Sequence, residues 1–123
     1  HVMFQCYVTS KGELDLMWYQ RSVDTFLGLP FNIASYALLS HIICELTGLT
    51  PRYLKCTLGD VHVYEGHLEA VGELLSREPK ELPQIRIPSL KTLEDLKRLT
   101  AKDFELVGYE SHGAIKAPLS VGV

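Results

Sequence analysis

The sequence predicts an α+β domain in which a mixed β-sheet packs against one long buried helix. Three observations lead to this prediction. Residues 2–8 and 13–21 read as paired strands, residues 33–46 are apolar around nearly the whole circumference of a helix, and residues 53–64 return to strand-like alternation. A helix that is apolar on all sides is buried on all sides, so we expect it at the centre of the core.

The chain has the size and composition of one globular domain. Its 123 residues contain 46% apolar side chains, enough for a core, and neither an internal repeat nor a linker. A net charge of −3 without a Lys/Arg cluster argues against binding to DNA or to acidic membranes. The three cysteines form no CxxC pair, so we expect neither a disulfide framework nor a metal site. The longest apolar run is shorter than the ~20 residues of a membrane span and no secretion signal opens the chain, so the cytoplasm is expected.

The first element is expected to be a β-hairpin. Its first strand is rich in β-branched and aromatic residues, and Ser10-Lys11-Gly12 supplies the turn. One face of the second strand is apolar and consists of Leu14, Leu16 and Trp18. The alternate residues form a mixed face, which we expect to look into a cleft or across an interface.

The remaining elements follow from caps and periodicity. Asn32 can cap the start of the long helix, and Gly48 ends it. Apolar residues at helical spacing predict an amphipathic helix over residues 67–77, which Pro79 stops. Less regular elements follow: a short strand at 84–87, a helix at 93–99, a strand at 104–109 and an apolar tail.

A group of polar residues interrupts the apolar stretch QRSVDTFLGLPFNIASY, residues 20–36. Buried polar groups need partners, which hydrocarbon neighbours do not supply. Arg21 and Ser22 offer a charged fork and a hydroxyl that could hold a phosphate, although an Arg near a strand end is more often a surface or ion-pair residue. The Asn32 amide can match a pyrimidine edge or cap the helix, and sequence alone favours the cap.

A second polar group lies in GDVHVYEGH, residues 59–67. On a strand, Asp60, His62 and Tyr64 would share one face at spacings of ~6.6 Å. Hydroxyl and imidazole groups in such a row suit the hydroxyls of a sugar. An ordinary strand with a polar outer face has the same pattern, and spacing alone favours that simpler interpretation.

Taken together, QRSVDTFLGLPFNIASYALLSHI and LGDVHVYEGHLEAV resemble the carboxyl-terminal half of thymidylate synthase. The resemblance runs from His1 to about Val121, through SREPKELPQI, KDFEL and GYESHGAIKAPLSV. It implies that residues 1–123 are the carboxyl-terminal part of a single thymidylate synthase-like domain. The complete enzyme would transfer and reduce a one-carbon unit from 5,10-methylenetetrahydrofolate to C5 of dUMP, giving dTMP and dihydrofolate, and would act as a homodimer.

The resemblance also implies which residues hold the nucleotide. The positions of Arg21 and Ser22 bind the phosphate of dUMP in that family. Asn32 corresponds to the residue that pairs with the pyrimidine edge. His62 and Tyr64 correspond to residues that reach the deoxyribose hydroxyl.

Further positions correspond to the reaction centre and the folate. Gln20 matches a residue near the nucleophile, and Asp24 matches one that organises the site and the folate. Leu27 and Gly28 match positions along the folate and nucleotide cleft. The apolar tail matches the segment that closes over the ligands. The resemblance implies no metal.

The chain departs from the family pattern at both ends. His1 matches the residue directly after the catalytic Cys of a Pro-Cys-His segment, so the nucleophile is expected just before His1. The missing amino-terminal half supplies further phosphate-binding arginines and much of the folate site, so this chain alone is expected to be inactive. Gly113 stands where the family usually has Pro, and Gly122-Val123 extend beyond its usual end, which puts the terminal carboxylate contact in doubt.

Two alternatives remain open at this point. One is a dUMP hydroxymethyltransferase of the same fold, because the residues that select hydride or water lie mainly upstream. The other is a non-catalytic nucleotide-binding module. For the synthase and for the hydroxymethyltransferase alike, Asn32 favours a uracil base, since relatives that act on deoxycytidylate carry Asp at this position.

Overall fold

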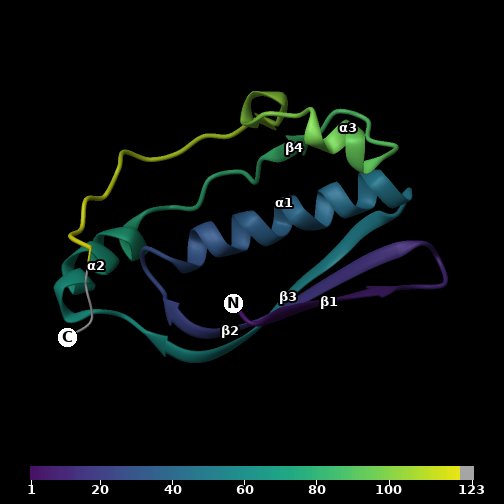
Figure 1. The fold of residues 1–123 in the computed structure, drawn as a ribbon. Coiled ribbons are helices and arrows are strands. Elements are labelled where there is room, and N and C mark those ends of the chain that lie inside the picture. The colour runs from purple at the N-terminus through teal and green to yellow at the C-terminus, as the bar shows by residue number, and fades with distance from the viewer. Residues whose placement is uncertain (120–123) are drawn as a thin grey trace.

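A three-stranded sheet with a long helix across one face forms the larger part of the chain (Figure 1). The computed structural model describes residues 1–119. The strands are β1 (Met3–Val8), β2 (Glu13–Asp24) and β3 (Thr50–His62), in that order across the sheet. β1 and β2 pair antiparallel, which confirms the predicted hairpin, and β2 pairs parallel with β3. The fold is therefore α+β with a mixed sheet, as predicted.

The helix α1 (Leu29–Thr47) is the crossover that parallel strands β2 and β3 require. It ends as predicted at Gly48, whose φ of 68° suits glycine and whose N–H donates to the Cys44 carbonyl. Its predicted start was wrong, because Gly28 occupies the cap position and Asn32 lies inside the first turn. The Asn32 backbone N–H already donates to the Gly28 carbonyl at 3.1 Å, and its side chain is directed elsewhere.

The core lies between β2 and the inner face of α1. Leu14, Leu16 and Trp18 are at most 1% exposed, which confirms the apolar face predicted for this strand. The Tyr36 ring of α1 stacks on the Trp18 indole with ring centroids 4.6 Å apart. Burying residues of this size contributes about 1.5–3 kcal/mol each, so this layer is the main source of stability.

The outer face of α1 is open, so the prediction of a helix buried on all sides was wrong. Only Ser40 and Cys44 of α1 are buried, and Phe31 is 75% exposed. The sheet covers one side of the helix, and the other side borders a cavity of about 790 Å³ beside Leu106 and Tyr109. By length and composition α1 could also cross a membrane, but the Trp18–Tyr36 contact packs one of its faces on the sheet.

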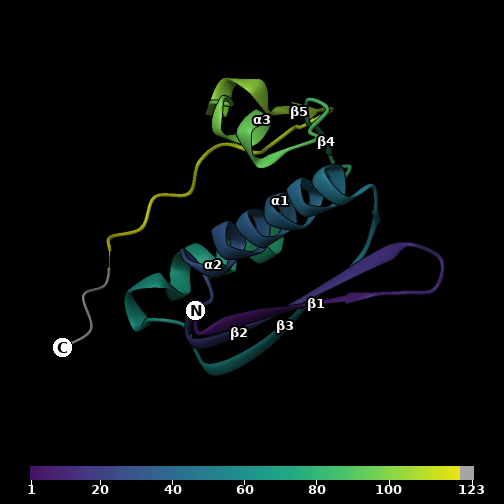
Figure 2. The ribbon, with the colours of Figure 1, turned by 45° about the vertical axis from the view of Figure 1, so that its right-hand side comes forward.

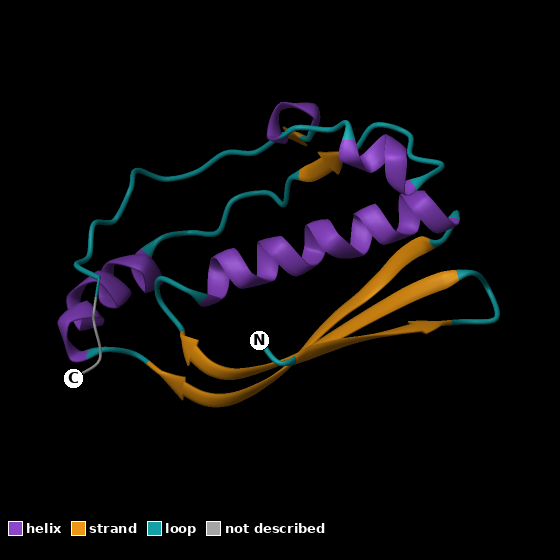
Figure 3. Cartoon of the chain, viewed as in Figure 1, coloured by secondary structure: helices purple, strands orange, loops and turns teal. Residues whose placement is uncertain are grey.

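The carboxyl-terminal part contains short elements; its α-helices and strands lie close to their predicted places, and two 3₁₀ turns, at residues 65–67 and 101–103, were not predicted (Figures 2 and 3). The elements are η1 (Glu65–His67), α2 (Leu68–Ser76), β4 (Gln84–Arg86), α3 (Leu93–Lys97), η2 (Ala101–Asp103) and β5 (Glu105–Val107). β4 and β5 pair antiparallel as a separate sheet. α2 leaves Leu75 80% exposed, so the apolar side predicted for this helix is largely uncovered. Residues Gly122-Val123, predicted to affect a terminal contact, lie outside the described residues.

The face of the sheet away from α1 carries an ion-pair cluster. Asp15 is 6% exposed and accepts two hydrogen bonds from the Arg52 guanidinium, each 2.7 Å long, while Lys55 Nζ lies 3.4 Å away. The Arg52 hydrogen bond lowers the pKa of Asp15 from 3.8 to about 2, with a smaller contribution from Lys55. On the mixed face predicted from the sequence, the buried carboxylate of Asp15 thus finds its partners, Arg52 and Lys55, within the chain.

Candidate functional site

The carboxyl ends of β2 and β3 meet the start of α1 at one edge of the sheet. Because the strands are parallel and adjacent, Ser22 lies beside Asp60 and Asp24 lies beside His62. The Thr25 N–H donates to the His62 carbonyl at 3.0 Å and joins the two strand ends. The structure therefore brings together two polar groups that are far apart in the sequence.

A relay of side-chain hydrogen bonds connects the core to this edge. The Trp18 Nε1–H donates to Gln20 Oε1 at 3.2 Å, and Gln20 Nε2 donates to Asn32 Oδ1 at 2.9 Å. An indole N–H can only donate, so Gln20 must present its oxygen to Trp18 and its NH₂ group to Asn32. Asn32 must then accept with its oxygen. The core thus fixes the orientation of the Asn32 amide, whose NH₂ donors and second oxygen lone pair remain for other partners.

Asp24 shapes the turn between β2 and α1. Its Oδ1 accepts hydrogen bonds from the backbone N–H groups of Phe26 and Leu27, both 3.1 Å long. A Cβ at Gly28 would lie 3.1 Å from the Asp24 carbonyl oxygen and 3.8 Å from Asn32 Oδ1, so a side chain would crowd this turn. Leu27 and Gly28 are half-buried and lie next to Asn32 in the same turn.

His62 and Tyr64 lie side by side, as the alternation predicted. Their rings meet edge to face with centroids 5.1 Å apart, and Asp60 Oδ1 lies 3.6 Å from His62 Nδ1. The predicted strand was too long at this end, because β3 stops at His62 and Tyr64 precedes the 3₁₀ turn η1. Both rings are half-buried and remain accessible from solvent.

His1 lies beside the same relay. Its Nδ1 is 3.1 Å from the Tyr36 hydroxyl, and its ring stacks on the Tyr36 ring, which in turn stacks on Trp18. In the antiparallel pairing Met3 is opposite Tyr19, so continuing the register places His1 level with Arg21. A residue directly before His1 would therefore lie next to the edge where β2, β3 and α1 meet.

Comparisons with known proteins identify the family of the chain. The family model for thymidylate synthase matches residues 1–121. The chain belongs to the thymidylate synthase family. It is 54% identical over 122 residues to a probable thymidylate synthase of Escherichia phage T5 and 46% identical over 121 residues to a thymidylate synthase of Corynebacterium aurimucosum. Each match covers 98% of this chain and 44% of the relative, so the chain spans less than half the length of these proteins.

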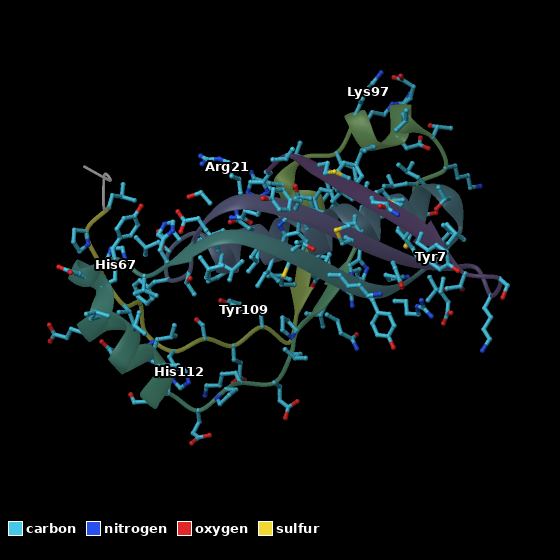
Figure 4. The ribbon with its side chains drawn as sticks, turned by 90° about the horizontal axis from the view of Figure 1, so that it is seen from below. Tyr7, Arg21, His67, Lys97, Tyr109 and His112 are labelled. Carbon is cyan, nitrogen blue, oxygen red and sulfur yellow. The ribbon has the colours of Figure 1, made fainter. Side chains whose placement is uncertain are left out.

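In this thymidylate synthase family chain, Arg21 and Ser22 lie exposed at the end of β2. The ion pairs found within residues 1–119 do not include Arg21, so of the surface and ion-pair interpretations only the surface one fits its exposed position. Figure 4 shows Arg21 extending outward from the sheet. Both side chains are therefore free to meet a ligand that arrives from solvent.

Sequence reasoning missed two residues that support the site. Trp18 was assigned only to the core, but its N–H also orients Gln20. Gly59 allows close approach of β3 to β2, because a Cβ there would lie 2.6 Å from the Arg21 carbonyl oxygen. Its place directly before the polar row of β3 was the available signal. Within the described residues no three His, Cys, Asp or Glu side chains gather in a metal-binding group.

Proposed function

We propose that this chain is the carboxyl-terminal part of an enzyme that methylates dUMP at C5 to give dTMP. The observation that carries the proposal is the Gln20–Asn32 pair, 2.9 Å apart, at the edge where the polar ends of β2 and β3 meet. An amide held in one orientation can donate to the O4 oxygen of uracil and accept from its N3–H. Cytosine presents the reverse pattern at these two atoms, so this amide selects uracil.

Residues around Asn32 match the remaining parts of the nucleotide. Arg21 and Ser22 are exposed and provide a guanidinium fork and a hydroxyl for a phosphate. His62 and Tyr64, in edge-to-face contact, provide groups that donate to or accept from a deoxyribose hydroxyl. These side chains occupy one sheet edge, so one nucleotide could contact all of them.

Asn32 would also assist the chemical step. Addition of a nucleophile to C6 of uracil places negative charge on O4, where the Asn32 NH₂ group would donate. Because Trp18 and Gln20 fix the amide before substrate binds, this donor needs no reorganisation during the reaction. Losing one such preorganised donor typically lowers kcat by about 10²- to 10³-fold.

The turn over residues 24–28 is the proposed folate contact. 5,10-Methylenetetrahydrofolate supplies the one-carbon unit and the hydride that completes the methyl group. Asp24 holds the turn through two backbone N–H groups and thereby places Leu27 and Gly28 beside Asn32. The apolar side chain of Leu27 and the absence of a side chain at Gly28 suit the contact of a flat ring with a nucleotide.

The chain is proposed to act together with an upstream half. The nucleophilic Cys is expected directly before His1, whose ring lies on Tyr36 beside the relay. The uncovered outer face of α1 would pack against the upstream half. The sheet face away from α1 carries exposed Tyr7 and Tyr53 and would form the contact of a homodimer.

The experiment that tests the function restores the missing half. The segment of the phage T5 relative that precedes the matched region is joined ahead of His1, with Pro-Cys placed as its last two residues. Calorimetry with dUMP and an assay for dihydrofolate formation are then applied to the joined protein and to the 123-residue chain. We expect micromolar dUMP binding and dihydrofolate release from the joined protein, and weak or no binding by the chain alone.

The same measurements distinguish the proposed function from its two alternatives. A joined protein that folds but does not bind dUMP would contradict the proposal. Release of tetrahydrofolate with a hydroxymethylated product would identify a dUMP hydroxymethyltransferase. Binding of dUMP without turnover of either kind would identify a nucleotide-binding module.

Asn32→Asp in the joined protein should shift preference from dUMP toward dCMP. The carboxylate oxygen still accepts from Gln20, so the relay is kept while the NH₂ group is replaced. A protonated carboxyl can donate to N3 of cytosine and accept from its amino group. We expect the ratio of affinities to change by about 10- to 100-fold, the range for one two-point polar contact.

Asn32→Ala is the matched control for this change. It removes both polar atoms, so dUMP affinity should fall without a gain for dCMP. An Asn32→Asp protein with unchanged preference would show that Asn32 does not read the base.

A further inference from the structure

His67 is a fully buried histidine that contacts the carboxyl tail. It ends the turn η1, has 0% exposure, and its Nε2 lies 2.7 Å from the carbonyl oxygen of Pro118. A carbonyl oxygen only accepts, so Nε2 must carry the proton and donate. The imidazole is buried, so losing this bond would leave its N–H without a partner, which is costly, although the Pro118 carbonyl lies on the exposed side of the bond.

Two weaker contacts hold the same tail along α2. Arg77 Nη1 donates to the Gly113 carbonyl at 2.5 Å, and His112 Nε2 lies 2.8 Å from the Glu78 carbonyl. Figure 4 shows His67 and His112 toward opposite ends of α2, and the tail runs back to this helix in Figure 1. Both outer bonds are exposed, so water competes for them, whereas the His67 bond is part-buried and its donor ring is fully buried.

His67 also packs against both segments that carry the site. Its ring lies 5.6 Å from the Tyr64 ring and 5.5 Å from the Phe26 ring, measured between centroids. Tyr64 contacts His62, and the Phe26 N–H donates to Asp24. One imidazole therefore connects the tail, the end of β3 and the turn after β2.

We propose that His67 is a positioning residue that anchors the tail, residues 112–118, on α2 and sets its place relative to Tyr64 and Asp24. The anchoring is a property of this chain and does not depend on the reaction. Its consequence for catalysis rests on the proposed function. Through His67, the position of the tail depends on Tyr64 and Asp24, which are proposed to meet the nucleotide and the folate. The Pro118 carbonyl is then the point at which the tail is fixed, and the exposed contacts of Arg77 and His112 contribute less to its position.

The anchoring is tested on the 123-residue chain by NMR. The imidazole nitrogens of His67 should show a single tautomer with the proton on Nε2. Deleting residues 118–123 should change both His67 nitrogen signals. A mixture of tautomers, or signals that do not respond to the deletion, would overturn the proposal without any substitution at the buried site.

Variants then separate the hydrogen bond from the shape of the ring. His67→Phe keeps a ring but has no donor, so ¹⁵N relaxation should show the tail amides of residues 114–117 becoming mobile. His67→Gln can still donate from its side-chain amide and should keep the tail ordered. His112→Gln, which changes an exposed histidine that also contacts a carbonyl, is the matched control and should leave these amides unchanged. Equal tail mobility in the Phe and Gln variants, with Trp18 fluorescence unchanged, would contradict the assigned role.

The catalytic consequence is measured in the joined protein. His67→Phe should raise the KM for 5,10-methylenetetrahydrofolate about tenfold and lower kcat, while dUMP affinity stays within twofold. His67→Gln should restore most of both losses. If the joined protein binds no dUMP, the proposed function fails while the NMR result still decides the anchoring. If it turns over normally with His67→Phe, the coupling to catalysis fails and the proposed function stands.

Discussion

The layer between β2 and α1 is shielded from solvent and is called the closed layer here. The part of the chain after residue 64, called the open part, leaves most of its side chains exposed. In the first region Leu14, Leu16 and Trp18 have almost no contact with solvent. In residues 65–119 only His67 and Leu90 are buried, and Leu75 and Leu82 are 80% and 91% exposed. Short elements there depend on capping boxes and exposed ion pairs, such as Arg86 with Glu105.

The difference shows how the site residues are held in place. Gln20 and Asn32 are polar, but they are oriented through Trp18, which belongs to the closed layer. Exposed ion pairs contribute little because water competes for both partners. Changes in the closed layer should therefore disturb stability and the site together, while changes in the open part should act locally.

Trp18→Ala should have the largest effect. It removes a side chain that is 1% exposed and stacked on Tyr36, and large-to-small changes of this kind cost about 3–5 kcal/mol. Urea unfolding followed by circular dichroism measures the loss. Leu75→Ala is the control from the open part and should change the free energy of unfolding by less than about 0.5 kcal/mol. Equal losses in the two variants would show that the two regions do not differ.

Gln20→Leu should cost about 1–3 kcal/mol, because the buried Trp18 N–H and the half-buried Asn32 oxygen both lose their partner. Trp18 is the only tryptophan of the chain, so its fluorescence reports directly on this change. Gln5→Leu, on an exposed position of β1, should leave both stability and fluorescence nearly unchanged. A Gln20→Leu chain as stable as the original would show that the relay does not join the site to the core.

Acid should weaken the chain through Asp15. Its pKa of about 2 in the folded chain lies below the ordinary 3.8, because Arg52 and then Lys55 favour the carboxylate. The contribution of this group is therefore complete above pH 3.8 and is lost as the pH falls toward about 2. Urea unfolding at several pH values should show a steeper acid loss for the original chain than for Asp15→Asn. Asp60→Asn, at an exposed position, should keep the original slope.

Thr92→Ala should have the smallest effect on global stability. Thr92 Oγ1 accepts from the Asp95 N–H at 3.2 Å, and Asp95 Oδ2 accepts from the Thr92 N–H at 2.9 Å, which caps α3. Losing the cap should destabilise this helix by ~1 kcal/mol. Because the Thr92 hydroxyl is the main cause of the lowered pKa of Asp95, that pKa should rise toward its ordinary value. NMR titration of Asp95 and hydrogen exchange in α3 measure the change, and a shift of the urea midpoint by as much as in Gln20→Leu would contradict a local role.

Much of the fold was predictable because its signals are local. The turn at Ser10-Lys11-Gly12 and the end of α1 at Gly48 depend on the conformations available to neighbouring residues. The alternation in β2 also gave its buried face correctly. The predicted cap at Asn32 failed because the cap of the helix lies four residues earlier, at Gly28, and the Asn32 side chain instead accepts from Gln20, twelve positions before it. The predicted burial of α1 failed because composition does not reveal how many neighbours a helix has.

The sequence by itself determined the family, the order of the main elements and the set of polar residues from which a site could be built. Only the tertiary structure decided that β2 and β3 are parallel neighbours, that Arg52 pairs with Asp15, and that His67 meets Pro118. Turns, caps and alternation follow from a few adjacent residues, whose steric and hydrogen-bonding preferences act wherever the segment lies. Contacts between distant residues depend instead on the packing of whole elements, and the orientation of the Asn32 amide follows only when the core around Trp18 is complete.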